Sequence, residues 1–520
     1  MSNRPRWPRD SCPYLRGTSG SNVMRRREEH GVLDHGRKTM SLLLTGSTVI
    51  DGVSDKGIDG RAILIEDGRI VAIDRQDALP VPAGTETVDF SGKFVIPGLM
   101  NANVHLLVNI LFETLVRYEG RYEDLIVEAA QVALKNGMTT VFDTWGPRRA
   151  LMSARDRIDR GVTSGSRIRC AGNIVGFDGP FSEDFDKRIP GVGSSHFVDR
   201  VNATWVENVG RHLMWLTPEA VGKEVREYIG RGVDFVKYAS NEHGGASAGA
   251  FIQFSERTQR VIVEEAHRAG LTAQAHTSSV EGLRMAIEAG CDLVQHCNTT
   301  GPTEIPRETL ELLAEKNCGA VVFPLTDNGF KILKESISDP EWTIWKASDV
   351  NARNLVDSGA SILLANDGGI FAPEVMNEPM VKGTWNGLPE DEGLNRLATG
   401  HFVWLRAMEE KGMSPIALLH AATLNIAKAY QVDDDLGTIE AGKIADLVVL
   451  DADPLRSAKN YQSIRAVIKD GAVVDLDALP EQPLLTADLP PTLEEEAHYK
   501  KALHHGARLP GCPSCLTGDH

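Results

Sequence analysis

The sequence has few cysteines, no long apolar run and no excess of positive charge. Its seven cysteines are too few and too scattered over 520 residues for a disulfide framework, which favours a reducing, cytoplasmic location. No apolar run approaches the roughly 20 residues that a transmembrane helix needs. With 55 basic and 72 acidic residues, the formal net charge is −17, which argues against nucleic acid or a membrane surface as a partner.

The two ends of the sequence differ from the rest. Residues 1–40 are rich in arginine and have no apolar segment typical of a signal peptide, so we expect a disordered extension or a start codon placed before the true one at Met40. Residues 479–520 are expected to be a C-terminal tail that ends in Cys512-Pro-Ser-Cys515. A Cys-x-x-Cys pair can bind zinc, but a single pair at a polar terminus is more typical of an unstructured segment.

Short strands are predicted near both ends of the remaining chain. After Met40, runs rich in β-branched residues alternate with the turn sequences Asp51-Gly52 and Asp67-Gly68. A similar block follows at 436–474. Neither block alone buries both faces of a sheet, so residues 41–96 and 430–478 are predicted to form one discontinuous β-sandwich.

Between these blocks, at 97–429, strand and helix patterns alternate. The predicted strands each follow a helix pattern, and they lie at 139–143, 234–238, 272–276, 292–296, 320–324 and 361–366. Repeated β/α units over this length predict an α/β protein with a (β/α)8 TIM barrel. An open doubly wound sheet is the competing architecture, but no Gly-x-Gly-x-x-Gly turn follows the first strand.

Metal-binding residue types stand at the ends of five predicted strands: His105, Lys237, His276, His296 and Asp367. Working residues of such barrels lie at the C-terminal ends of the strands. Imidazole and carboxylate are donors that a zinc-like ion prefers, whereas a lysine must be deprotonated or carbamylated to contribute, and we favour carbamylation. The segment 95–107 is predicted as one buried strand that places Asn103 and His105 on the same side.

These positions resemble the metal-dependent amidohydrolase superfamily over residues 42–474. The motifs that carry the resemblance are Pro97-Gly98-Leu99 before Asn103-Val104-His105, the sequence around Glu264–Gly270, Ala365-Asn366-Asp367, Ala421–Asn425 and Gly437–Asp446, together with Lys237, His276 and His296. The branch that includes imidazolonepropionase-like hydrolases and prolidase-type peptidases is the most similar. Asn103, where two-metal members have histidine, resembles the smaller subgroup of phenylurea hydrolases and molinate hydrolase, which hold one metal.

The resemblance implies a single divalent ion, with zinc expected and cobalt, manganese or iron as alternatives. Lys237, His276 and His296 would hold it, while Asn103 would be a weak ligand or lie just outside the ligands. A set made of His105, His276 and Asp367 is the alternative geometry. The resemblance also implies a homo-oligomer.

The implied reaction is hydrolysis of a C–N or thiocarbamate bond in an amide, urea or carbamate-like small molecule, with an aryl urea of the herbicide type as the expected substrate. Asp367 would act as general base on a metal-activated water, and His105 or His296 would stabilise the oxyanion. The alternatives are a prolidase-like dipeptidase or another amidohydrolase acting on a cyclic amide, and a metal-free relative without activity.

Residues in the loops after the predicted strands are candidates for substrate contacts. Several are aromatic, which suits a flat apolar substrate, although aromatic side chains also pack protein cores. The candidates are Trp145, Phe177, Asp178, Phe181, Tyr238, His243, Thr326 and Phe371.

Overall fold

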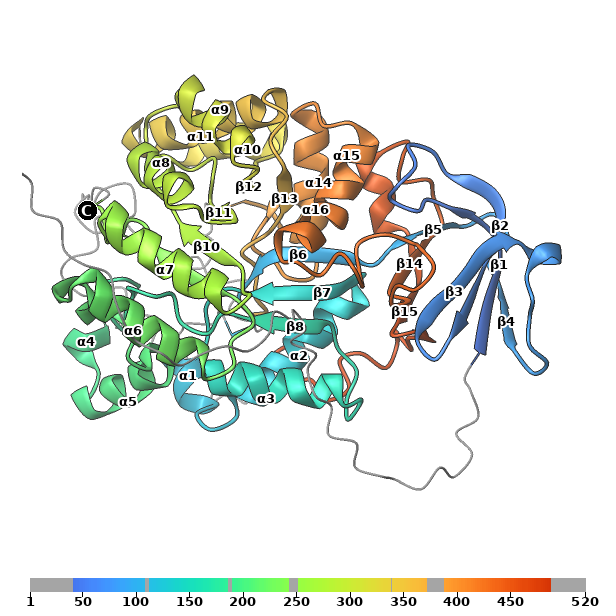
Figure 1. Cartoon of the computed structure of the whole chain (residues 1–520), viewed down its shortest axis with the longest axis horizontal. Coiled ribbons are helices and arrows are strands. Elements are labelled where there is room, and N and C mark those ends of the chain that lie inside the picture. The colour runs from blue at the N-terminus through green and yellow to red at the C-terminus, as the bar shows by residue number, and fades with distance from the viewer. Residues whose placement is uncertain are drawn as a thin grey trace, which may run out of the picture. The chain divides into compact units, whose positions relative to one another are not determined.

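The computed structural model of the chain describes residues 41–107, 112–185, 189–242, 251–337, 339–371 and 388–487. The extension predicted at 1–40 lies outside the described residues, as do His243, Cys512 and Cys515. Figure 1 shows a β-rich part at one end of the described chain and a larger part in which strands are surrounded by helices.

The β-rich part combines strands from both predicted blocks. Its sheet has the order β16-β15-β14-β5-β1-β2-β3, and β4 pairs with β1. These strands are β1 (Ser41–Val49), β2 (Ile58–Glu66), β3 (Arg69–Arg75), β4 (Glu86–Asp89), β5 (Phe94–Pro97), β14 (Leu447–Leu450), β15 (Ile464–Lys469) and β16 (Ala472–Val473). One apolar cluster contains Leu44 and Ile63 from the first block and Val449 and Ile468 from the second. The two blocks therefore share a core, as the sequence predicted.

A glycine separates the β-rich part from the barrel. The segment 95–107 was predicted as one strand, but β5 ends at Pro97 and pairs with β14, whereas β6 (Leu99–Val104) belongs to the barrel. Gly98 lies between them and its N–H donates to the carbonyl of Asp446 (2.8 Å). A Cβ at this position would collide with the side chain of Thr139, so close packing against β7 requires glycine here.

Eight parallel strands form the barrel. One run has the order β6-β7-β8 and the other β9-β10-β11-β12-β13. The strands after β6 are β7 (Met138–Asp143), β8 (Arg167–Cys170), β9 (Val236–Ala239), β10 (Ala273–His276), β11 (Leu293–Gln295), β12 (Gly319–Val322) and β13 (Ile362–Leu364). Parallel bridges join the two runs at both ends, between Val175 and Tyr238 and between Val104 and Gly368. Every residue of β6 and β7 is buried, as expected for parallel strands covered on both faces.

Helices follow the strands and cover the barrel (Figure 1). Their bounds are α1 (Phe112–Arg117), α2 (Tyr122–Lys135), α3 (Arg148–Asp159), α4 (Ile189–Val192), α5 (Ser195–Val206), α6 (Pro218–Ile229), α7 (Glu256–Arg268), α8 (Val280–Ala289), α9 (Arg307–Glu315), α10 (Asp327–Ser336), α11 (Asp339–Asp357), α14 (Gly400–Glu410), α15 (Pro415–Ala421) and α16 (Leu424–Ala429). Several begin at a side-chain cap, such as Ser255 accepting from the N–H of Thr258, and Ser279 from that of Gly282. None of the helices in the described ranges combines the length and apolar character needed to cross a membrane.

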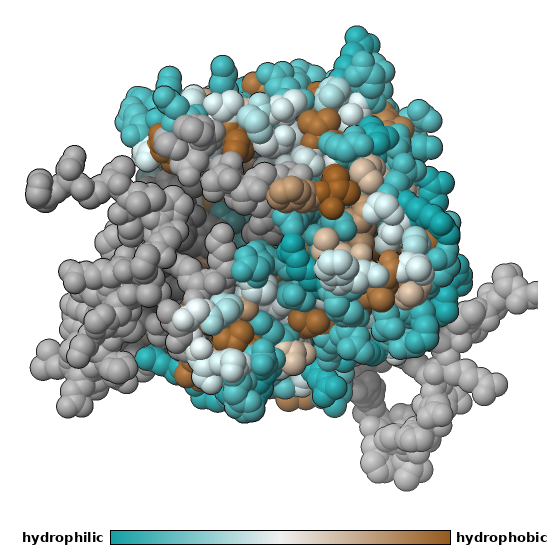
Figure 2. Space-filling model, turned by 90° about the vertical axis from the view of Figure 1, so that its left-hand side faces the viewer, coloured by the Kyte–Doolittle hydropathy of each residue, from teal (hydrophilic) through white to brown (hydrophobic). Residues whose placement is uncertain are grey.

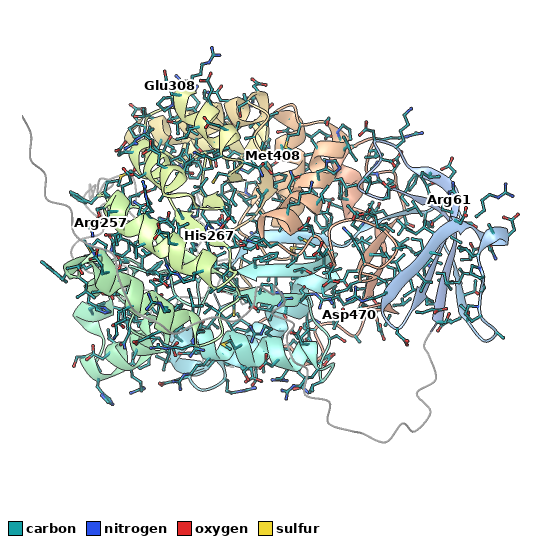
Figure 3. The ribbon with its side chains drawn as sticks, viewed as in Figure 1. Arg61, Arg257, His267, Glu308, Met408 and Asp470 are labelled. Atoms are coloured by element: carbon teal, nitrogen blue, oxygen red, sulfur yellow. The ribbon has the colours of Figure 1, made fainter. Side chains whose placement is uncertain are left out.

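Charged contacts connect the barrel to the β-rich part. Arg167 on β8 pairs with Asp470, which lies where the two parts meet (Figure 3), and its guanidinium is 3.4 Å from a carboxylate oxygen of Asp446. The start of the predicted C-terminal tail also packs on the barrel: buried Glu128 on α2 accepts from the N–H groups of Leu485 and Thr486. Residues 479–487 thus continue the folded part of the chain.

Candidate active site

The five predicted ligand positions come together at one end of the barrel because all eight strands run in the same direction. In the ladder, Lys237 pairs with Gln274 two residues before His276, and His276 pairs with Gln295 directly before His296. On the opposite side, the N–H of His105 donates to the carbonyl of Gly368, and that of Asp367 donates to the carbonyl of Asn103. These contacts place the carboxyl ends of β6 and β13 side by side.

His105 and Asp367 are in direct contact. Nε2 of His105 is 2.7 Å from Oδ1 of Asp367, and their side chains are 12% and 26% exposed. Burial acts to raise the pKa of Asp367, but nearby His105 outweighs it, and His296 and Lys237 act in the same direction, so the pKa lies below its usual value. Asp367 is therefore an ionised carboxylate at neutral pH.

Two of the site residues have unusual backbone geometry. His296 has φ of 56° and Asp367 has φ of 50°, in the left-handed region that non-glycine residues seldom adopt. His296 comes directly after β11, which ends at Gln295, and Asp367 comes three residues after the end of β13 at Leu364. Such conformations persist where the surrounding structure enforces them, and they cluster at functional sites.

Asn103 is held by hydrogen bonds on both sides of its amide. Its Nδ2 donates to Oε1 of Gln295 (2.9 Å), and its Oδ1 accepts from the hydroxyl of Thr144 (2.5 Å). The residue is fully buried. Asn103 is thus part of the polar network inside the barrel, which continues from Gln295 to Gln274.

Lys237 lies next to this network. Its Nζ donates to the hydroxyl of Thr144 (3.0 Å), so Thr144 connects Lys237 to Asn103. Burial lowers the pKa of Lys237 to about 8, although Asp367 and Asp143 act to raise it. The neutral amine that carbamylation requires is therefore accessible near neutral pH.

Asp143, at the end of β7, is a further buried carboxyl group close to the site. Burial raises its pKa to about 7, although His105, the N–H groups of Leu106 and Trp145, and Lys237 act to lower it. Its Oδ2 accepts from the N–H of Leu106 (2.7 Å) directly after His105. Asp143 therefore holds the backbone directly after His105 in place.

The remaining two imidazoles lie among aromatic rings. The ring centroids of His276 and His296 are 4.9 Å apart, in an edge-to-face arrangement. Phe177 packs edge to face on His276 (5.3 Å), and Phe323 lies beside His296 (4.8 Å). On the other side of the site, Trp145 meets His105 edge to face at 5.9 Å.

The predicted substrate contacts divide into residues near the imidazoles and residues away from them. Trp145 and Phe177 are near them, whereas the fully buried Tyr238 interacts with Cys291 behind the barrel strands. Thr326 caps α10 and donates to Glu392. The carboxylate of Asp178 accepts from the main-chain N–H of Arg211. Phe181 is buried against Phe197. Phe371 is partly exposed at the end of the described stretch 339–371.

The structure adds residues to the site that the sequence did not indicate. Thr144 is hydrogen-bonded to Asn103, and both Asp143 and Asn173 accept hydrogen bonds from Trp145. Phe185 stacks on Trp145 with ring centroids 3.9 Å apart. For Asp143 and Thr144, the sequence signal was their position at the end of a predicted strand. Asn173 and Phe185 had no such signal.

The donor chemistry at this end of the barrel fits a divalent ion. Three imidazoles, a carboxylate and an amine with a lowered pKa are present, and Nδ1 of His105 is buried without a hydrogen-bond partner in the described part of the chain. No three His, Cys, Asp or Glu side chains of the described residues are already gathered around one point that could hold a metal. Lys237 is a further possible donor at this end of the barrel: its Nζ donates to Thr144, and Asp367 and Asp143 are the charged groups that act on it.

The sequence and the fold define the class of protein. Residues 94–474 match the amidohydrolase family, and the chain belongs to this family. The structure of molinate hydrolase is 38% identical with a TM-score of 0.81, and the match covers 88% of this chain and 98% of that one. Phenylurea hydrolase B is 36% identical with a TM-score of 0.81, over 86% of this chain and all of the other. Among sequence relatives, an imidazolonepropionase of Thermoplasma acidophilum is 24% identical over 421 residues, which is 79% of this chain and 85% of the relative.

These similarities confirm the predicted fold, a TIM barrel with a discontinuous β domain, and the predicted class. The protein is a hydrolytic enzyme of the amidohydrolase class. Figure 2 shows the face that lies at left in Figure 1, where the coloured surface is mainly hydrophilic with small separate apolar patches.

Proposed function

We propose that the protein hydrolyses a C–N or thiocarbamate bond in a small urea, carbamate or amide, with an aryl urea as the substrate. The observation that carries the proposal is the placement of His105, Asp367 and the His276–His296 pair at one end of the barrel. The substrate class is supported by the 36–38% identity to molinate hydrolase and phenylurea hydrolase B over almost the whole of their chains. Trp145 and Phe177 beside the imidazoles suit a flat substituent.

Members of this family generally depend on a metal, and Lys237, His276 and His296 would hold one ion here. When bound, such an ion would lower the pKa of a water molecule and polarise the carbonyl group of the substrate. Zinc is the proposed ion, and a carbamylated Lys237 would contribute oxygen donors. The set of His105, His276 and Asp367 is the alternative.

The residues of the chain handle the proton. Asp367 accepts the proton of the attacking water while His105, 2.7 Å away, orients the carboxylate. The water oxygen bonds to the carbonyl carbon, the C–N or C–S bond breaks, and Asp367 returns the proton to the leaving nitrogen or sulfur. His105 or His296 would stabilise the negative charge on the carbonyl oxygen.

A substrate screen tests the proposal. Purified protein from metal-supplemented expression is incubated with aryl ureas, thiocarbamates, N-acyl amino acids including dipeptides with a C-terminal proline, and a cyclic amide, and the products are quantified by chromatography. We expect turnover of the aryl ureas by the wild type, and about 10³-fold slower turnover by Asp367→Asn purified identically. Turnover of proline dipeptides or the cyclic amide alone would instead support another amidohydrolase activity, and no turnover with no bound metal would support an inactive relative.

A further inference from the structure

We infer that Asn173 is a positioning residue that sets Trp145 and Phe177 beside the two sides of the active site and thereby determines its preference for flat substituents. The inference about substrates rests on the proposed function, whereas the inference about position does not. Asn173 follows β8, outside the positions indicated by the sequence, and is fully buried.

The amide of Asn173 joins two loops of the barrel mouth. Its Oδ1 accepts from the indole Nε1–H of Trp145 (3.2 Å), which follows β7. Its Nδ2 donates to the main-chain carbonyl of Phe177 (2.7 Å), which follows β8. An indole N–H only donates and a carbonyl only accepts, so one carboxamide satisfies both groups in one orientation.

The backbone of Asn173 is fixed as well. Its N–H donates to the hydroxyl of Tyr228 on α6 (2.7 Å), and that hydroxyl donates to the carbonyl of Ala171 (2.9 Å). Because every polar group of this linkage is buried and paired, loss of the amide would leave two buried groups without partners. The fold therefore fixes the position of the amide, and the amide in turn fixes the positions of both loops.

The two anchored aromatic residues contact different imidazoles. Trp145 meets His105 at 5.9 Å, and Phe177 meets His276 at 5.3 Å. Phe185 connects them, since it stacks on Trp145 (3.9 Å) and meets Phe177 edge to face (5.9 Å). Asn173 thus holds the opposite ends of one aromatic wall, composed of Trp145, Phe185 and Phe177.

A matched control is available on helix α5, which follows the loop that contains Asn173. Asn202 on α5 also makes two hydrogen bonds with its amide, accepting from the N–H of Phe181 (2.9 Å) and donating to its carbonyl (2.8 Å). It anchors the loop after β8 without contacting Trp145. Asn202→Leu therefore removes the same kind of anchor but leaves the aromatic wall attached to Asn173.

The test compares Asn173→Leu with Asn202→Leu in the full-length enzyme. Proteins labelled with 5-fluorotryptophan report on Trp145 by 19F NMR, with the resonance assigned from Trp145→Phe. We expect the Trp145 resonance to shift or broaden in Asn173→Leu and to stay unchanged in Asn202→Leu. If Asn173→Leu does not fold, Asn173→Ala, which leaves space for a water, carries the same comparison. An unchanged Trp145 resonance would overturn the inference.

Kinetics test the consequence for specificity. Asn173→Leu should lower the ratio of kcat/KM for an N-aryl urea to that for its N-alkyl counterpart by about tenfold, mainly through a higher KM for the aryl substrate. An unchanged ratio, or an equal loss of kcat for both substrates, would contradict the role in specificity. If the wild type hydrolyses neither urea, the proposed function fails and the 19F result alone decides whether Asn173 positions Trp145.

Discussion

The two sides of the barrel mouth hold their polar side chains in different ways. At the ends of β6 and β7, Asn103 and Thr144 are joined by a hydrogen bond inside the barrel, and Lys237 of β9 donates to Thr144. At the ends of β10 and β11, His276 and His296 face each other and the rings of Phe177 and Phe323. Asn103 is thus a hydrogen-bonded member of the polar network, whereas His276 and His296, two of the three proposed metal ligands, lie on the aromatic side.

Removing the proposed base should have the largest effect. Asp367→Asn should lower kcat by about 10³-fold, because the amide cannot accept the proton of the attacking water. Metal content, measured by mass spectrometry of the purified protein, should stay close to that of the wild type. Asp451→Asn, on the half-exposed partner of Lys93, is the control.

Two results would contradict this account of Asp367. Activity that survives in Asp367→Asn would remove its role as base. Loss of the metal together with the activity would instead favour the ligand set of His105, His276 and Asp367.

Removing Lys237 should remove one proposed metal ligand and the hydrogen bond from Lys237 to Thr144. Lys237→Ala should weaken metal binding by about 100-fold, because the buried site loses one donor and Thr144 loses a partner. If Lys237 is carbamylated, a short carboxylic acid added to the variant should restore part of the activity. Restoration by methylamine and not by the acid would contradict carbamylation.

Changing Asn103 tests whether its side of the mouth can accept a second ion. Asn103→His should raise the metal content toward two ions per chain, since it adds an imidazole next to His105. It should also lower the free energy of unfolding by about 1–3 kcal/mol, because Gln295 and Thr144 lose their partner. Asn103→Ala loses the same bonds without adding a donor, so its metal content should stay at one. A content of one in both variants would show that position 103 does not set the stoichiometry.

A smaller effect is expected away from the mouth, at His401. Burial lowers the pKa of this histidine from 6.5 to about 4, and its Nε2 is hydrogen-bonded to the carbonyl of Asn136. At pH values between these two pKa values, His401 is protonated in the unfolded chain and neutral in the folded chain. The free energy of unfolding therefore falls as the pH drops below about 6.5. The buried neutral His401 lowers the free energy of unfolding by about 1 kcal/mol at pH 5.5, and this loss disappears as the pH rises above 6.5.

Urea unfolding at several pH values measures the contribution of His401. His401→Gln should remove this part of the pH dependence. His420→Gln, which alters a histidine bonded to the carbonyl of Gly52, should keep it. An equal pH dependence in His401→Gln and the wild type would show that His401 is not its source.

Much of the fold could be predicted because its periodic patterns are local. The strand β10 (Ala273–His276) lies within the predicted range 272–276, and the polar strand ends led to a site that joins His105 to Asp367. The strand β8 was missed because its four residues alternate two arginines with Ile168 and Cys170. In the barrel, Arg167 pairs with Asp446 and Asp470 of the β-rich part, a contact that no local pattern indicates.

The supporting residues of the site could not be predicted for a related reason. Thr144 and Asn173 are short polar residues without informative spacing, and each acts by joining segments far apart in the chain. Tyr238 is next to Lys237 in sequence, yet its side chain points behind the strand, because alternate residues of a strand face opposite sides. Prediction of such contacts requires the register of the barrel strands.

The most direct test of the central claim, a hydrolytic site with one metal, is a metal titration of protein freed of metal with a chelator. Zinc is added in steps while turnover of the best substrate from the screen and bound metal are both measured. Activity should reach its plateau at one ion per chain. A plateau reached only at two ions per chain, or full activity in the metal-free protein, would contradict the claim.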